Sequence, residues 1–299
     1  MKHLALAVGA ALAVSTAAVA SPALASSRAA TTPGAVYLGY KSTGVEVTTQ
    51  QGGLSRLTVG GGNFVGQFAA APGGGKVAWI DGKSRLHVKS ASGDKVIAQN
   101  AAYGGPCLTP AWSADGKRIA YVVKGTADAG TVALVGSGGG RPVTAGKTLG
   151  VCHLAWSADG KTLAGYAGDT DGVYLLNTVS HVSTRVPGIK LANHVDGLSP
   201  NGDRVVVNTI SPSDPGGDGS WPLAYTPSLY ETKTGKKITI PVKGTLIGAR
   251  FLYDGTLVVR VKGRSFNTWV VLDPDTYKVS QRVPEIKEAR NLGLLGVMG

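Results

Sequence analysis

PAWSADGKRIAYV, residues Pro110 to Val122, is a short apolar run, a polar turn that ends in Asp-Gly, and a second apolar run. The chain repeats it as LAWSADGKTLAGYA from Leu154 to Ala167. Aligning the turns gives five copies, with the shared glycine at Gly74, Gly116, Gly160, Gly202 and Gly255. Successive glycines are 42, 44, 42 and 53 residues apart. A period of forty-odd residues built from short apolar runs is typical of four-stranded propeller blades.

Each period divides into four strand-like pieces, of which the second and third are richest in Val, Leu, Ile and Tyr, as buried middle strands should be. Near the N-terminus, VYLGY, VEVTT and SRLTV supply three further strands, and Asn291 to Met298 supplies a fourth. We therefore predict an all-β, six-bladed β-propeller of four-stranded antiparallel blades, with the N- and C-terminal strands sharing one blade. Such closure leaves no exposed sheet edge.

The PxWSxDGKxIAY pattern, followed by a strand such as VYLLN, resembles the repeats of the TolB-type propellers, a branch of the WD-repeat-like superfamily. The resemblance covers about residues 35–298 and is closest in the two copies quoted above. In that family the repeat specifies the fold and variable loops select the ligand. The resemblance therefore implies a binding protein without naming its ligand.

The N-terminus has the pattern of a cleaved signal peptide. Lys2 precedes an apolar run from Leu4 to Ala20, and Ala23-Leu24-Ala25 offers a cleavage site before Ser26. We expect a signal peptide over 1–25, a loose leader over 26–34 and a single propeller domain over 35–299. The expected location is extracytoplasmic, secreted or associated with the cell envelope, with no transmembrane segment after cleavage.

The chain carries a formal net charge of +12, which favours anionic partners. Its lysines and arginines are scattered, however, and an exposed basic surface that only aids solubility explains the same pattern. Because no basic segment is interleaved with aromatic residues, nucleic acid is not an expected partner.

The Asp-Gly turns are expected to be structural. Glycine supplies positive φ at little cost, and the aspartate can accept a hydrogen bond from the backbone that follows it. Trp112, Trp156, Leu198 and Phe251 occupy one equivalent place before the turns. We expect these four to pack between adjacent blades rather than to stack on a ligand.

The two cysteines precede the inner strands of consecutive blades. Cys107 lies five residues before Trp112, and Cys152 lies four before Trp156. In an oxidising compartment a disulfide between them is the preferred interpretation, and two free thiols are the alternative. Two cysteines without a Cys-x-x-Cys pair do not indicate a metal site.

Four polar residues depart from the repeat in one region. His153, His194 and Asp196 are expected where the chain enters the inner strands, and Arg250 replaces a small residue on the next inner strand. Two histidines and a carboxylate could bind a metal ion or act as an acid–base pair. The alternative is an Asp196–Arg250 ion pair beside ordinary histidines at the rim.

The 53-residue period holds an insertion, ISPSDPGGDGSWPLAY, near residues 209–226. It is expected on the rim opposite the Asp-Gly turns. Trp221 and Tyr225 are candidate binding residues there, because exposed rigid aromatic side chains bind well. Equally, the two could fold back over the outside of the fifth blade.

The sequence thus predicts an exported, non-enzymatic binding scaffold for a protein or an anionic envelope polymer, using the rim of the 209–226 loop. The first alternative is a lyase or hydrolase with a His/Asp site, with or without a metal ion, at the channel mouth. A third possibility is a vestigial propeller whose ligand is a small sugar or peptide. We expect no cofactor and a monomer.

Overall fold

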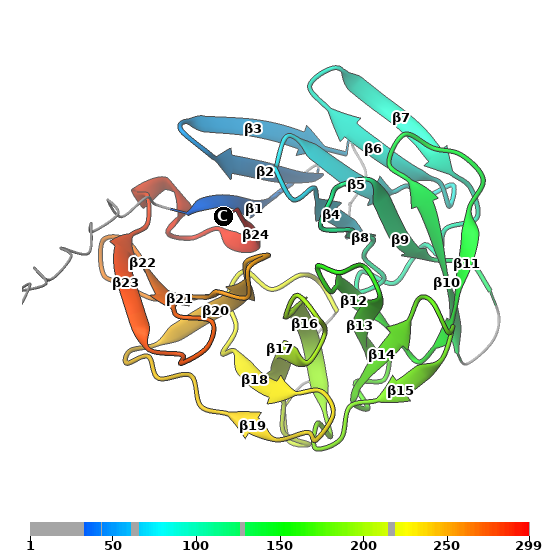
Figure 1. Ribbon diagram of the computed structural model, residues 1–299. Coiled ribbons are helices and arrows are strands. Elements are labelled where there is room, and N and C mark those ends of the chain that lie inside the picture. Colours follow the sequence, from blue (N-terminus) through cyan, green and yellow to red (C-terminus); the bar gives the residue numbers. More distant parts are fainter. Residues whose placement is uncertain (1–32, 43, 61–65, 126–128, 215–218, 299) are drawn as a thin grey trace, which may run out of the picture. The chain divides into compact units, whose positions relative to one another are not determined.

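The computed structural model describes residues 33–42, 44–60, 66–125, 129–214 and 219–298. Within these ranges, twenty-four strands form six antiparallel sheets arranged as blades around a centre (Figure 1). The only helix described is one 3-10 turn, η1 (Lys287–Ala289). The predicted six-bladed, all-β propeller is therefore confirmed.

Five blades are continuous in sequence, and in each the first strand is innermost. They are β4 (Phe68–Ala70), β5 (Lys76–Ile80), β6 (Leu86–Ser90) and β7 (Gly93–Ala98); β8 (Ala111–Trp112), β9 (Arg118–Val122), β10 (Gly130–Gly136) and β11 (Val143–Thr148); β12 (Gly150–Trp156), β13 (Thr162–Ala167), β14 (Val173–Asn177) and β15 (Ser183–Arg185); β16 (Ala192–Leu198), β17 (Arg204–Thr209), β18 (Ser228–Glu231) and β19 (Lys237–Ile238); β20 (Leu246–Phe251), β21 (Leu257–Val261), β22 (Thr268–Leu272) and β23 (Val279–Pro284).

The sixth blade closes the ring with both ends of the described chain. Its order is β24 (Gly293–Met298), β1 (Gly34–Lys41), β2 (Gly44–Gln50) and β3 (Leu54–Val59). β24 pairs antiparallel with β1, and Ala35 lies opposite Val297. The first strands β4, β8, β12, β16, β20 and β24 contact one another in a closed cycle. The predicted closure by the terminal strands is confirmed, and it removes two sheet edges that would otherwise pair with other chains.

The Asp-Gly turn is fixed by hydrogen bonds that the repeat reproduces. In one copy, Asp115 Oδ1 accepts from the Ser113 hydroxyl at 2.6 Å and from the Lys117 amide at 3.0 Å. Ser157 and Asp159 repeat this pattern in the next blade with the same two distances. These bonds lower the pKa of the exposed Asp115 carboxyl, the Ser113 hydroxyl contributing most. The repeated serine and aspartate are therefore a turn device, as predicted.

The two repeat tryptophans fasten neighbouring blades together. Trp112 Nε1 donates to the Ala69 carbonyl of the preceding blade at 3.0 Å, and Trp156 Nε1 donates to the Ala111 carbonyl at 3.2 Å. Leu198 and Phe251 are buried at the equivalent places. The sequence prediction of packing between blades is confirmed, and the hydrogen bonds add a polar link that it did not include.

The expected signal peptide (1–25) and most of the expected leader (26–34) lie outside the described residues. The first strand begins at Gly34, one residue before the predicted domain boundary. Across the described ranges, no helix is long and apolar enough to cross a membrane.

Candidate functional site

Cys107 and Cys152 form a disulfide with a Cα–Cα distance of 4.7 Å, as predicted. It joins the loop before β8 to β12 and closes a separation of 45 residues. By loop-closure entropy, a bridge of this span stabilises a fold by about 4 kcal/mol. The backbone amide of His153 donates to the Cys107 carbonyl at 2.7 Å, so the bridge also positions the next residue along β12.

The two candidate histidines are buried inside inner strands, not at the rim where the sequence placed them. His153 lies in β12 and His194 in β16, and their side chains are shielded from solvent. Both strands begin earlier than expected and contain register shifts of the β-bulge type. His153 itself has a φ of +48°. Because bulges redirect side chains, the two rings turn toward each other.

The histidines belong to one chain of polar contacts. His153 Nε2 lies 3.0 Å from the Gly219 carbonyl oxygen, and its Nδ1 lies 2.7 Å from Nδ1 of His194. His194 Nε2 lies 3.4 Å from Asp196 Oδ1. A carbonyl only accepts, so the proton of neutral His153 sits on Nε2, and His194 donates through Nδ1. With its proton on Nδ1, neutral His194 has none on Nε2. The contact from His194 Nε2 to Asp196 Oδ1 is therefore a hydrogen bond only when one further proton is taken up.

Burial governs the protonation of both rings. Loss of solvent lowers the pKa of His153 well below its usual value, and a nearby His194 charge adds to this effect. Burial also lowers the pKa of His194, although the hydrogen bond and charge of Asp196 oppose it. The extra proton therefore belongs at His194, beside the carboxylate, when the pH falls.

Asp196 and Arg250 form the ion pair that was the alternative interpretation of these residues. Arg250 Nη1 lies 3.7 Å from Asp196 Oδ1 and also donates to the Leu295 carbonyl of β24. Asp196 is fully buried, whereas 22% of the Arg250 side chain is exposed. Among the described residues, Asp196 Oδ2 has no hydrogen-bond partner. This oxygen is itself shielded from solvent, so it is not open to a molecule in the channel.

Trp221 is buried, contrary to the exposed position that would suit a binding aromatic. It also does not fold over the outside of the fifth blade. Its Nε1 donates to the Leu294 carbonyl at 3.0 Å, and its ring centroid lies 5.1 Å from that of His153 and 4.7 Å from that of His194. The described part of the insertion that carries Trp221 therefore lies at the centre of the ring, and the Trp221 indole fills space between the inner strands.

Tyr225 supports the same closure from the insertion. Its hydroxyl donates to the Ala249 carbonyl at 3.1 Å and accepts from the Ala249 amide, and its ring lies 4.6 Å from His194. Burial raises the pKa of this phenol well above its usual value, and the Asp196 charge adds to the shift. Tyr225 is therefore a neutral structural group at neutral pH.

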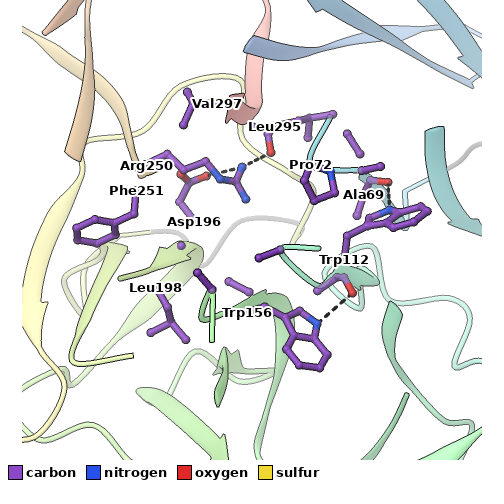
Figure 2. Close-up of a pocket in the computed structure, with 18 of the residues that line it drawn as sticks. Ala69, Pro72, Trp112, Trp156, Asp196, Leu198, Arg250, Phe251, Leu295 and Val297 are labelled. Atoms are coloured by element: carbon purple, nitrogen blue, oxygen red, sulfur yellow. Dashed lines mark hydrogen bonds and ion pairs between the residues drawn. The ribbon is translucent and has the colours of Figure 1, made fainter. Parts of the chain in front are cut away.

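A cavity of about 110 Å³ occupies the central channel (Figure 2). Small residues and indole rings from the inner strands form its wall, and Pro72, Ala114, Ala158 and Tyr253 from the Asp-Gly turns surround its mouth. Asp196, Arg250 and Trp221 line its inner end. His153, His194 and Tyr225 do not line it. Of the six candidate residues, three therefore reach the cavity and three lie behind its floor.

The sequence did not indicate which end of the channel is open. Tyr253, almost half exposed at the mouth, was not a candidate, because it occupies the alanine place of an ordinary turn. The sequence feature that could have identified Tyr253 is its size, because Ala114 and Ala158 occupy the same place in two other turns. Within the described ranges, no three His, Cys, Asp or Glu side chains are grouped as a metal ion would require.

No protein-family model matches the sequence, and no curated protein matches it. Among solved structures, TolB from Acinetobacter baumannii matches with a TM-score of 0.53 and 12% identity, over 89% of this chain and 65% of the TolB chain. The fold is that of a TolB-like β-propeller. A chain in the nidogen/laminin complex also matches, with a TM-score of 0.53 and 10% identity, over 89% of this chain and 97% of that chain.

The tricorn protease matches with a TM-score of 0.50 and 11% identity, over 84% of this chain and 30% of the protease chain. At these identities the likeness is one of fold alone. Because unrelated functions share one fold, the function must be argued from the residues of the site itself.

Proposed function

We propose that this TolB-like propeller is an exported, non-enzymatic binding module whose ligand enters the central channel from the rim of Asp-Gly turns. The observation that carries the proposal is the asymmetry of the channel. Trp221 lies at one end of the cavity, and the turn residues surround the other. A concave pocket with a few polar groups at its base is the usual form of a binding site.

The positions of the histidines favour binding over catalysis. A general acid or base must reach a substrate directly or through one water. His153 and His194 lie behind Trp221, bond to each other and to protein acceptors, and do not line the cavity. The lyase or hydrolase alternative would need them at the channel mouth.

Export is proposed from two independent features. Residues 1–25 have a signal-peptide pattern, and the Cys107–Cys152 disulfide fits an oxidising compartment. The N-terminal sequence of protein recovered outside the cytoplasm tests this part: it should begin at Ser26. Recovery of only the full-length chain inside the cell would contradict it.

Binding at the channel is tested with arrays of peptides and glycans and the mature protein. Gly197 lines the cavity, and a Cβ built there would meet only Arg250 Cγ, at 3.7 Å. Gly197→Val should therefore fill the floor and abolish retention. Gly168→Val is the matched control, because a Cβ there meets nothing within 4 Å. Retention that survives Gly197→Val would place the ligand elsewhere.

An anionic polymer on the opposite rim is a second candidate function, favoured by one specific hollow. Lys262, Arg290, Asn267 and Leu223 line a cavity of about 200 Å³ beside the insertion. Exposed Arg264 and Lys287 lie in the same two loops, together with one exposed acidic residue, Glu288.

Retention on a polyanionic resin across a salt series tests this candidate. Lys262→Gln with Arg290→Gln should lower the salt concentration needed for elution. Lys117→Gln with Lys161→Gln, on the turn rim, should not. Equal effects of both pairs would mean that only overall charge matters.

A further inference from the structure

The hollow on the rim of the insertion combines basic and apolar side chains in one lining. It lies where the blade of β20 to β23 meets the segment before β24 (Figure 1). Among the described residues, no acidic side chain lines it, and neither Lys262 nor Arg290 forms an ion pair. The rest of the lining is largely apolar and includes Leu223, Ile247 and Leu292. A ligand that matches both parts is an amphiphile with an anionic group.

A buried cluster holds the two charged loops of this hollow in place. The guanidinium of Arg260 donates to Glu285 Oε2 from Nε at 3.1 Å and from Nη2 at 2.8 Å, and also to two backbone carbonyls of the 285–292 segment. Asn267 Nδ2 donates to the same carboxylate oxygen at 2.7 Å. These bonds tie the 262–267 loop to the 285–292 segment. Because Glu285 neutralises Arg260, the cluster fixes the hollow without adding net charge.

The exposed charges of these two loops are mostly positive. They carry four exposed basic side chains and one exposed acidic side chain, a local net charge of +3 (Lys262, Arg264, Lys287, Arg290 and Glu288). The surface of a bilayer rich in anionic phospholipids is negative and attracts clusters of this kind. The charge of the insertion rim is therefore complementary to such a surface.

Two exposed apolar side chains accompany the basic ones. Leu223 is 41% exposed and lines the hollow, and Phe266 is 40% exposed on the loop whose Lys262 and Gly263 line it. A soluble anionic polymer would be attracted by the charges and would gain little from these side chains. A phospholipid surface uses both features, because apolar side chains enter the boundary between headgroups and acyl chains. The combination therefore favours a lipid surface over a soluble polymer.

We propose that this part of the insertion rim docks on an anionic phospholipid surface. A lipid phosphate binds between Lys262 and Arg290, and Leu223 and Phe266 enter the headgroup region. The inference rests on the second candidate function and specifies its anionic partner. The channel mouth lies among the Asp-Gly turns on the opposite rim, so a docked molecule keeps that mouth open to its own ligand.

The experiment sediments the mature protein with vesicles across a salt series. One set of vesicles is phosphatidylcholine alone, and the other mixes it with an equal amount of phosphatidylglycerol. The protein should bind only the mixed vesicles, and less at high salt. Lys262→Gln with Arg290→Gln should weaken this binding about tenfold or more, since each cation near an anionic bilayer contributes about fivefold.

The apolar side chains separate a lipid surface from a polymer. Leu223→Ser with Phe266→Ser should weaken vesicle binding about tenfold and leave retention on the polyanionic resin unchanged. Val179→Ser with Val182→Ser is the matched control, because these exposed valines lie in the β14–β15 turn beside the Asp-Gly turn of Gly160. The control should change neither measurement. Circular dichroism and thermal unfolding check that each variant folds.

Each other outcome overturns a defined part of the account. Resin retention that depends on Lys262 and Arg290, without binding to mixed vesicles, would overturn the lipid inference and leave the polymer candidate intact. Vesicle binding that ignores Leu223→Ser with Phe266→Ser would also overturn the inference, because charge alone would explain it. Equal losses in the valine control would place the lipid surface on the turn rim. If the charge variant changes neither resin retention nor vesicle binding, both the inference and the polymer candidate are wrong.

Discussion

The Nδ1 atoms of His153 and His194 lie 2.7 Å apart, in a buried contact between two neighbouring blades. Together with Trp221 and Tyr225 they close the channel at the insertion end. The two histidines therefore lie behind the channel cavity, and their structural role is to hold its floor.

This contact predicts that stability falls as the solution is acidified. Burial lowers the pKa of both histidines in the folded state, whereas the unfolded chain titrates near pH 6.5. The unfolded state therefore takes up protons more readily, and the stability present above about pH 6.5 is lost below it, by up to about 1.4 kcal/mol per pH unit for each histidine.

Urea unfolding at pH 8, 7, 6 and 5 measures this dependence. His153→Gln should reduce the slope of the unfolding free energy against pH, because it removes one of the two buried rings. A free energy of unfolding that rises between pH 7 and pH 5 would contradict the account.

The disulfide should contribute about 2–5 kcal/mol to the free energy of unfolding. A Cys107→Ser, Cys152→Ser variant removes it, and chemical denaturation compares the variant with wild type. Reductant should destabilise the wild-type protein by a similar amount and leave the variant unaffected. If reductant changes neither protein, the bridge is absent in solution.

Trp221 can be tested in two steps. Trp221→Phe loses the bond to the Leu294 carbonyl and should cost about 1 kcal/mol of stability. Trp221→Ala also leaves a cavity among the histidines and should cost about 3–5 kcal/mol. Thermal unfolding with matched circular dichroism spectra measures both. Equal, small losses would show that the indole is not packed in the channel.

Substituting two glycines that share one φ value distinguishes the cost of backbone strain from the cost of a steric clash between blades. Gly74 and Gly52 both have a φ of +67°, but a Cβ on Gly74 would lie 2.4 Å from Thr49 Cγ2, whereas one on Gly52 meets nothing within 4 Å. Gly52→Ala should cost about 1 kcal/mol from backbone strain. Gly74→Ala should cost clearly more, because the turn must also move away from β2. Equal costs would contradict the packing of this turn.

The fold was predictable from the sequence because its determinants are local and repeated. The repeated turns mark the start of each blade, so the number of blades could be predicted. The strands near the two termini could be counted, so their sharing of one blade could be predicted as well. The Cys107–Cys152 bridge was the preferred interpretation because both cysteines lie shortly before the repeat tryptophans of consecutive blades, although two free thiols remained the alternative.

The arrangement of the site was less predictable, because it depends on departures from the repeat. Bulges in β12 and β16 turn His153 and His194 inward, and no sequence pattern predicted these bulges. Trp221 lies in a Pro/Gly-rich insertion whose direction is set by the Leu294 carbonyl, 73 residues away. Long-range contacts of this kind decide which end of the channel is open.

The most direct test of the central claim compares ligand capture after blocking each end of the channel. Ala158→Cys places a thiol at the turn mouth, and Leu223→Cys places one on the exposed part of the insertion. Each protein is coupled to a bulky maleimide and applied to the glycan and peptide arrays. The account predicts that the label at residue 158 abolishes retention and that the label at residue 223 does not. Loss of retention with the label at residue 223 alone would contradict it.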